Sequence, residues 1–338
     1  MTSIKNRIIL GLMTFGPPEV SFSRINSISE AAKVFQYLKD HGYSEIDTAR
    51  MYIDGRQEAF TAEVGYKNYG LGIATKCFPV HQGEHSATEL PKYLEKSLKE
   101  LKTDSVDIFY LHAPDRKTPI LETLQTMDKL HKEGKFKIFG VSNYSAFEVS
   151  EMVTLARVHG LLQPMLYQAR YNCLARTIEP ELIPALRRYG IDLVVYNPIA
   201  GGLLSGKYQK EVIPTAGRYA MDNWIGQMIR KRYFTEGHWR ALEIIEQAAK
   251  KHNLTLPEIA FRWLVHHSML RLGSASSQQG DGIIIGISAF DQLVSNLDDL
   301  EKGPLPKEIL VAVDEAYHVA IPDVEPYFWG KLEYEYNY

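Results

Sequence analysis

Short apolar segments alternate with amphipathic segments along nearly the whole chain, and no other feature of the sequence restricts the fold as strongly. The apolar run at 106–112, for example, is followed by apolar residues at helical spacing over 119–132. Strands that alternate with helices of this length form parallel β-α-β units, because a parallel connection needs a crossover. The alternation therefore predicts an α/β fold with a parallel sheet.

About eight such units can be counted, which favours a closed (β/α)8 barrel of the TIM type. An open, doubly wound sheet remains the alternative, although the sequence has no GxGxxG motif after its first strand. The predicted strands cover 8–13, 44–47, 71–76, 106–112, 136–141, 165–168, 193–196 and 282–286. The predicted helices cover 29–41, 88–101, 119–132, 145–159, 179–188, 239–252, 256–267 and 290–300.

A long interruption, roughly 200–238, separates the seventh strand from the next helix and predicts a long loop. The sequence contains no low-complexity stretch typical of a linker, so we expect one barrel domain over 1–338. The tail, 324–338, is rich in aromatic and acidic residues. Such a tail either packs on the barrel or is disordered.

Composition excludes several classes of function. The formal net charge is -3 and no basic block stands out, which argues against a nucleic-acid partner. The two cysteines, Cys77 and Cys173, are far apart and show no zinc-ligand spacing, so no metal is expected. No stretch approaches the roughly 18 apolar residues of a membrane span. We therefore expect a cytoplasmic protein without a membrane partner.

Polar or aromatic residues end many of the predicted strands. The active site of such a barrel lies at the carboxyl ends of its strands, so these residues are expected to meet at one rim. They are Asp47 with Tyr52 in the following loop, Lys76, His112, Ser142 and Asn143, Gln168, and Tyr196 with Asn197.

A carboxylate, a phenol, an amine and an imidazole at one rim indicate proton transfer. A tyrosine with its usual pKa near 10 is a poor acid at neutral pH, and a nearby lysine lowers that pKa. Asp47 would keep Lys76 charged, and His112 could orient a substrate carbonyl. Tyr52 would then supply the proton to a carbonyl oxygen that gains negative charge as it accepts a hydride. Taken singly, a lysine at a strand end is more often a surface charge, and an aspartate at a strand end often caps the next helix.

Three stretches resemble the aldo-keto reductase family over about 8–330: Gly42 to Tyr52, Asp107 to His112, and Gly140 to Asn143. The resemblance implies that Asp47, Tyr52, Lys76 and His112 are catalytic. It further implies that Ser142, Asn143 and Gln168 contact the nicotinamide carboxamide and that the ring of Tyr196 stacks on the nicotinamide.

The segments 196–207 and 286–296 are most similar to the aflatoxin-aldehyde reductase branch, which implies NADPH as cofactor. NADH stays open, because Ser288 and Gln292 stand where many relatives outside the branch have lysine and arginine. The further cofactor contacts implied are Asn197, Pro198, Gly201, Gly202, Leu203, Ser205, Lys207, Arg218, Gly286, Ser288, Gln292 and Asn296.

The expected function is NADPH-dependent reduction of an aldehyde, dialdehyde or ketone, with Tyr52 as proton donor. Two alternatives remain: a nucleotide-binding regulatory subunit of the same fold, and an alcohol-oxidising dehydrogenase in a biosynthetic pathway. The branch resemblance also indicates a homodimer. Trp329 follows Tyr327-Phe328 where that branch ends in arginine, which argues against its preference for acidic aldehydes. Arg230 and Arg232 are candidates to hold an anionic substrate, or are solvated loop charges.

Overall fold

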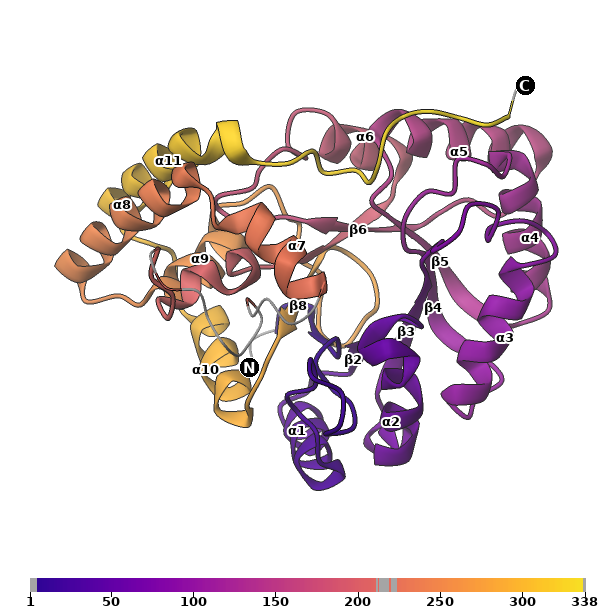
Figure 1. The fold of residues 1–338 in the computed structure, drawn as a ribbon, viewed down its shortest axis with the longest axis horizontal. Coiled ribbons are helices and arrows are strands. Elements are labelled where there is room, and N and C mark those ends of the chain that lie inside the picture. The colour runs from indigo at the N-terminus through magenta and orange to yellow at the C-terminus, as the bar shows by residue number, and fades with distance from the viewer. Residues whose placement is uncertain (1–4, 211, 213–218, 220–223, 337–338) are drawn as a thin grey trace.

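Eight parallel strands close into a barrel, in which each strand pairs with the next in sequence and the last pairs with the first (Figure 1). The computed structural model describes residues 5–210, 212, 219 and 224–336. The (β/α)8 prediction is confirmed, and the open-sheet alternative is wrong. The strands are β1 (Ile8–Gly11), β2 (Glu45–Asp47), β3 (Gly72–Cys77), β4 (Val106–Leu111), β5 (Phe136–Ser142), β6 (Leu166–Arg170), β7 (Asp192–Tyr196) and β8 (Gly282–Gly286).

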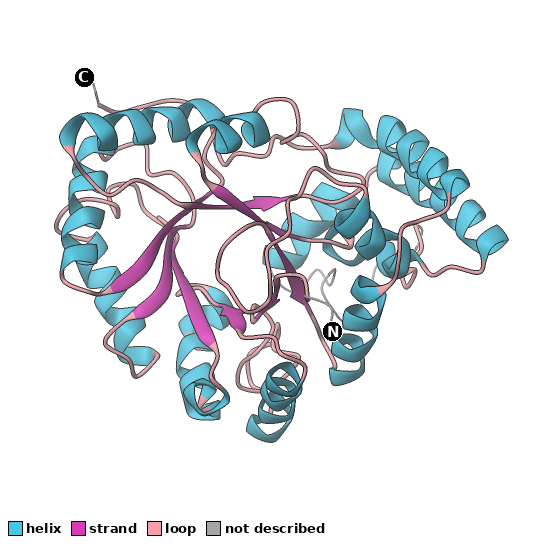
Figure 2. Ribbon diagram, turned by 180° about the vertical axis from the view of Figure 1, so that it is seen from behind, coloured by secondary structure: helices cyan, strands magenta, loops and turns pink. Residues whose placement is uncertain are grey.

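Helices surround this ring of strands (Figure 2). Local sequence sets several of their starts: Ser27 caps the first helix through the amide of Glu30, and Ser145 and Glu148 form a capping box. The helices are α1 (Ile28–Asp40), α2 (Gln57–Val64), α3 (Leu90–Glu100), α4 (Ile120–Lys132), α5 (Ala146–His159), α6 (Leu182–Tyr189), α7 (Trp224–Tyr233), α8 (Glu236–His252), α9 (Leu256–His266), α10 (Phe290–Glu301) and α11 (Lys307–Ala320).

Three helices were absent from the sequence prediction. Helix α2 buries Gln57, Glu58 and Thr61, so it lacks the usual apolar stripe. Helix α7 lies inside the segment predicted as a long loop, so that segment is partly helical. Helix α11 packs against α8. None of the helices in the described ranges is long and apolar enough to cross a membrane.

The interior of the barrel is filled by side chains, so it is a core and not a pore. Residues including Ile108, Tyr110 and Leu166 form this inner cluster. Gly140 of β5 lies opposite Tyr110 of β4, and a Cβ at Gly140 would come within 2.3 Å of the Tyr110 ring. Glycine is needed here because the tyrosine ring occupies the space of a side chain.

The described part of the C-terminal tail packs on the loops at the carboxyl ends of the strands. The hydroxyl of Tyr327 accepts a hydrogen bond from the amide of Ala146 at 3.0 Å. The amide of Trp329 donates to the carbonyl of Asn143 at 2.8 Å. Of the two expectations for the tail, packing is therefore the one that holds for 324–336. Residues 337–338 lie outside the described residues.

Candidate active site

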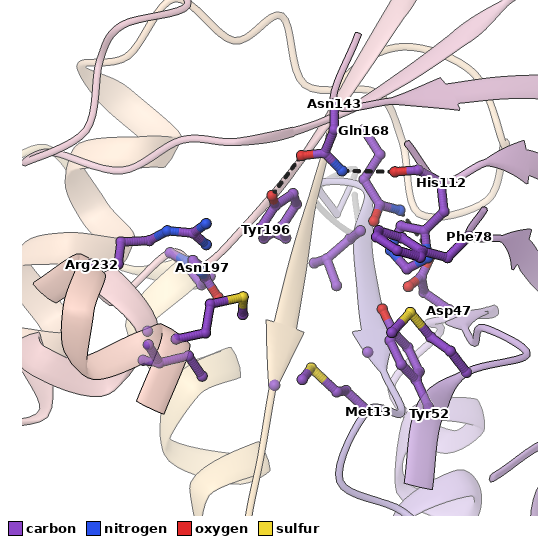
Figure 3. A pocket seen from close by; sticks show the side chains of 18 of the residues that line it. Met13, Asp47, Tyr52, Phe78, His112, Asn143, Gln168, Tyr196, Asn197 and Arg232 are labelled. Atoms are coloured by element: carbon purple, nitrogen blue, oxygen red, sulfur yellow. Dashed lines mark hydrogen bonds between the residues drawn. The ribbon is translucent and has the colours of Figure 1, made fainter. Parts of the chain in front are cut away.

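Asp47, Lys76 and His112 lie at the carboxyl ends of adjacent strands, as the sequence predicts. Asp47 is the last residue of β2, Lys76 is the next to last of β3, and His112 directly follows β4. Tyr52 begins a short 3-10 turn after β2. The four side chains meet at one rim of the barrel, and Figure 3 shows Asp47, Tyr52 and His112 close together in the pocket.

Lys76 is buried and its ammonium group donates in three directions. It donates to the Asp47 carboxylate, to the carbonyl of Thr48 at 2.6 Å and to the hydroxyl of Tyr52 at 3.4 Å. The second carboxylate oxygen of Asp47 accepts a hydrogen bond from the amide of Gln168 at 2.9 Å. The Tyr52 hydroxyl therefore lies beside a positive charge that is held in place on two other sides.

Burial shifts the pKa values of two groups at this rim. It lowers the pKa of Lys76, while Asp47 raises it again. Burial, assisted by the charge of Lys76, lowers the pKa of His112 well below its usual 6.5. The imidazole is thus neutral at pH 7. It can donate one hydrogen bond to a carbonyl oxygen without bringing a second positive charge beside Lys76.

The rim opens into a cavity of about 310 Å³, within the range of small-molecule sites. Within the described ranges, no group of three or more His, Cys, Asp or Glu side chains is placed to hold a metal ion. Residues lining the cavity are Gly11, Met13, Asp47, Met51, Tyr52, Ile53, Phe78, His112, Asn143, Gln168, Tyr196, Asn197, Pro198, Ile199, Gly201, Met228, Ile229, Arg232, Phe261, Ile284, Gly286 and Trp329.

Two asparagines adopt left-handed backbone conformations just after their strands. Asn143 has φ 63° and Asn197 has φ 59°, a region that asparagine tolerates better than most residues. The amide of Asn143 donates to the carbonyl of His112 at 2.7 Å, and its oxygen accepts from the hydroxyl of Tyr196 at 3.3 Å (Figure 3). These contacts hold the Tyr196 side chain in the cavity wall.

The predicted cofactor residues divide into two sets. Those lining the cavity are Asn143, Gln168, Tyr196, Asn197, Pro198, Gly201 and Gly286. Those lying outside its wall are Ser142, Gly202, Leu203, Ser205, Lys207, Ser288, Gln292 and Asn296. Arg218 lies outside the described residues.

The segment after β7 turns sharply through two glycines. Residues Ala200–Ser205 form a 3-10 turn in which Gly201 and Gly202 have φ 66° and 109°. A Cβ at Gly201 would come within 2.8 Å of the Tyr233 ring. At the end of β8, no atom lies within 4 Å of the position a Cβ would take at Gly286. The amide of Gly202 donates to the carbonyl of Ile199 at 2.9 Å, so the turn is held by its own backbone, and Gly201 and Gly286 line the cavity beside it.

Several cavity residues were not predicted from the sequence. Met51, Phe78, Met228 and Phe261 line the wall. A signal existed for Phe78, which stands two positions after Lys76 at the end of a strand whose side chains alternate. Trp329 closes one side and makes an edge-to-face contact with Phe78, with ring centroids 5.6 Å apart.

Arg230 and Arg232, both in the segment that the sequence predicts as a long loop, have different surroundings. Arg232 lies on α7, lines the cavity and donates through Nε to Glu325 at 2.8 Å. It is therefore an ion-paired residue and not a solvated loop charge. Arg230 is outside the cavity wall, and its guanidinium lies 4.5 Å from the ring centroid of Phe234.

Comparison with known proteins agrees with this arrangement. The family model described as "Aldo/keto reductase family" matches residues 7–318. An aldo-keto reductase of Pseudocercospora fijiensis is 40% identical over 297 residues, covering 86% of this chain and 98% of the relative. Aflatoxin B1 aldehyde reductase member 2 of Mus musculus is 38% identical over 334 residues, covering 95% of this chain and 87% of the relative. Aldo-keto reductase family 7 member A3 of Homo sapiens is 36% identical over 331 residues, covering 95% and 96%. The chain belongs to the aldo/keto reductase family, whose members are oxidoreductases that act on carbonyl groups.

Proposed function

We propose that this chain reduces an aldehyde, dialdehyde or ketone with NADPH and that Tyr52 donates the proton. The observation that carries the proposal is the position of the Tyr52 hydroxyl, 3.4 Å from the buried ammonium of Lys76 and on the wall of the cavity. A positive charge beside a phenol favours the phenolate, so proton release becomes easier. The cavity is also large enough to admit a small organic substrate.

The cofactor residues named from the resemblance are proposed in the same roles. The amide groups of Asn143 and Gln168 and the ring of Tyr196 line the same cavity as Tyr52, which fits a flat nicotinamide ring. Gly201 lines the cavity where the backbone turns after β7, and this turn is proposed to contact the pyrophosphate. When bound, the cofactor supplies the hydride. NADPH is preferred in this proposal, and NADH is its competitor in the test below.

The chain's own residues would divide the remaining work. His112, neutral and at the cavity wall, orients the carbonyl oxygen through a hydrogen bond. Tyr52 donates a proton to that oxygen as its negative charge develops. Lys76 stabilises the phenolate left on Tyr52, and Asp47 keeps Lys76 protonated and fixed. Phe78, Met51 and Trp329 limit the access of water to the reacting atoms.

The direct test is cofactor oxidation by the purified protein, measured as loss of absorbance with NADPH or NADH. The substrate panel contains a nitrobenzaldehyde, a carboxybenzaldehyde, a dicarbonyl and succinic semialdehyde. Turnover by the wild type and its loss in Tyr52→Phe would support the proposal. Tight NADPH binding with no turnover on any substrate would contradict it and favour a nucleotide-binding regulatory subunit.

Three further predictions accompany the proposal. We propose that 1–338 forms one domain, that the chain forms a homodimer and that it acts in the cytoplasm. One cooperative unfolding transition would support the first, since independent domains usually unfold separately. Light scattering after size exclusion measures the second, and fractionation of the source cells measures the third.

A further inference from the structure

The cavity carries a positive charge on the side away from Tyr52. The guanidinium of Arg232 lies across the pocket from Tyr52 in Figure 3. Its side chain is only 16% exposed, so water screens it weakly. A charge in this position would attract a substrate that carries a carboxylate at its far end.

A carboxylate from the C-terminal tail, outside the cavity wall, already pairs with this guanidinium. Oε2 of Glu325 accepts a hydrogen bond from Nε of Arg232 at 2.8 Å and lies 3.7 Å from Nη1 of Arg170. Arg170 also donates to the carbonyls of Glu325 and Pro326 at 2.7 and 3.2 Å. Two arginines, from β6 and α7, therefore hold one residue of the tail.

Glu325 is ionised at neutral pH. Burial raises the pKa of its carboxyl, but the hydrogen bond from Arg232 and the charges of Arg232 and Arg170 lower that pKa below its usual value. A substrate carboxylate approaching Arg232 would therefore meet a negative charge beside it. It would also compete with Glu325 for Arg232.

The wall beside His112, across the cavity from Arg232, is apolar and aromatic (Figure 3). Trp329 and Phe78 lie edge to face, and Phe78 lies edge to face with His112, with both pairs of ring centroids 5.6 Å apart. The amide of Trp329 donates to the carbonyl of Asn143, and its carbonyl accepts from Arg116 at 2.7 Å, so the backbone at Trp329 is held on both sides. Such a wall favours an aryl group, which gains both contact area and edge-to-face geometry.

We propose that Glu325 makes the cavity selective for neutral aromatic carbonyl compounds over carboxylate-bearing ones, by pairing with Arg232. This inference rests on the proposed carbonyl reduction for its substrate class. What it predicts is that the cavity binds neutral ligands more tightly than anionic ones of similar size. That difference in affinity can be measured by binding alone, without turnover.

The experiment compares two ligands of similar size, para-carboxybenzaldehyde and the methyl ester of para-formylbenzoate. Binding is measured by calorimetry in the presence of NADP⁺, which prevents turnover. The wild type should bind the ester more tightly. Glu325→Gln removes the charge and keeps a hydrogen-bond acceptor, so it should shift the affinity ratio toward the carboxylate by about tenfold.

Three variants separate charge from tail geometry. Glu325→Asp keeps the charge and should keep the wild-type ratio. The double variant Glu325→Gln/Arg232→Met should lack the higher affinity for the carboxylate that Glu325→Gln shows, because it no longer has the positive charge of Arg232. The control is Glu333→Gln, which changes a tail carboxylate that is 77% exposed and 3.9 Å from Lys331, and it should leave the ratio unchanged.

Three results would overturn the inference: a wild type that prefers the carboxylate, equal shifts in Glu325→Gln and Glu325→Asp, or a change in NADP⁺ affinity without a change in the ratio. The last result would mean that Arg232 binds the cofactor and not the substrate. Turnover with NADPH is measured in parallel. A shifted binding ratio without turnover would contradict the proposed reduction and leave the charge selectivity standing.

Discussion

The ammonium group of Lys76 lies buried behind the cavity wall and donates a hydrogen bond to the carboxylate of Asp47, which lines that wall. Burial alone lowers the pKa of this lysine, and the attraction of Asp47 opposes that change. Asp47 is in turn held through its second oxygen by Gln168. The charge that faces Tyr52 therefore depends on a carboxylate that itself does not need to touch the substrate.

Replacing Asp47 with asparagine should move the alkaline limb of the pH profile to lower pH. Asp47 raises the pKa of Lys76, so its loss lets burial lower that pKa further. Lys76 would then lose its proton, and its effect on Tyr52, at a lower pH than in the wild type. The measurement is kcat/KM against pH for both proteins.

Asp54→Asn is the matched control for this profile. Asp54 is exposed, lies in the turn that follows Tyr52 and has φ 52°, which asparagine tolerates. Its profile should coincide with that of the wild type. An alkaline limb that stays in place in Asp47→Asn would contradict the assigned role of Asp47.

Removing the phenolic hydroxyl of Tyr52 should abolish most reduction while NADPH still binds. Tyr52→Phe keeps the ring, whose centroid is 6.0 Å from that of His112, and removes only the proposed proton donor. A loss of about 10² to 10⁴-fold in kcat/KM is expected for a general acid. Stopped-flow turnover and fluorescence titration with NADPH measure the two quantities.

Tyr43→Phe serves as the control, because its hydroxyl contacts Glu301 at 3.4 Å, away from the cavity. Near wild-type turnover is expected for it. If Tyr52→Phe kept most of its activity, another group would have to donate the proton.

The site residues at the strand ends were predictable, because a closed parallel barrel brings the carboxyl ends of all its strands to one rim. Neighbouring strands are in register at Asp47 and Ala74, and at Lys76 and Tyr110, so their carboxyl ends meet at one rim. The apolar runs mark the strands, and the polar residue that ends each run then falls at that rim. This is why Asp47, Lys76 and His112 could be grouped before their geometry was known.

The wall formed by the tail could not be predicted in the same way. Arg232 and Glu325 are 93 positions apart, and no period in the sequence connects them. Their pairing depends on where α11 ends and how the tail crosses the loops. Helix α11 itself had a signal, since Ile309, Val313, Ala316 and Ala320 are buried at helical spacing.

Acidification should destabilise the fold below pH 6.5, because buried histidines stay neutral in the folded state. Burial lowers the pKa of His85 to about 4 and that of His238 to about 4, and that of His112 well below 6.5. The unfolded chain binds protons at these residues from pH 6.5 downward, and the folded chain does not. Stability is thus complete above pH 6.5 and falls as the pH is lowered toward 4.

His85 and His238 should each contribute up to about 1.4 kcal/mol per pH unit between pH 6.5 and 4. Urea unfolding at pH 7, 6 and 5 measures the slope. His238→Gln keeps a polar group near Thr235, which lies 2.8 Å from the histidine ring nitrogen, and should reduce the slope. An unchanged slope in this variant would mean that His238 binds a proton as readily in the folded protein as in the unfolded chain.

Adding a methyl group at Gly140 should destabilise the barrel. The new Cβ would lie 2.3 and 2.4 Å from two carbons of the ring of Tyr110, a residue that is 1% exposed. Overpacking of this kind costs about 1–3 kcal/mol. Urea unfolding of Gly140→Ala measures the loss of unfolding free energy.

Gly303→Ala is the control, because no atom lies within 4 Å of its added methyl group. It should change the free energy of unfolding by no more than about 0.5 kcal/mol. Equal stability of the two variants would show that the Tyr110 ring can leave this position, and that Gly140 is not required by its packing.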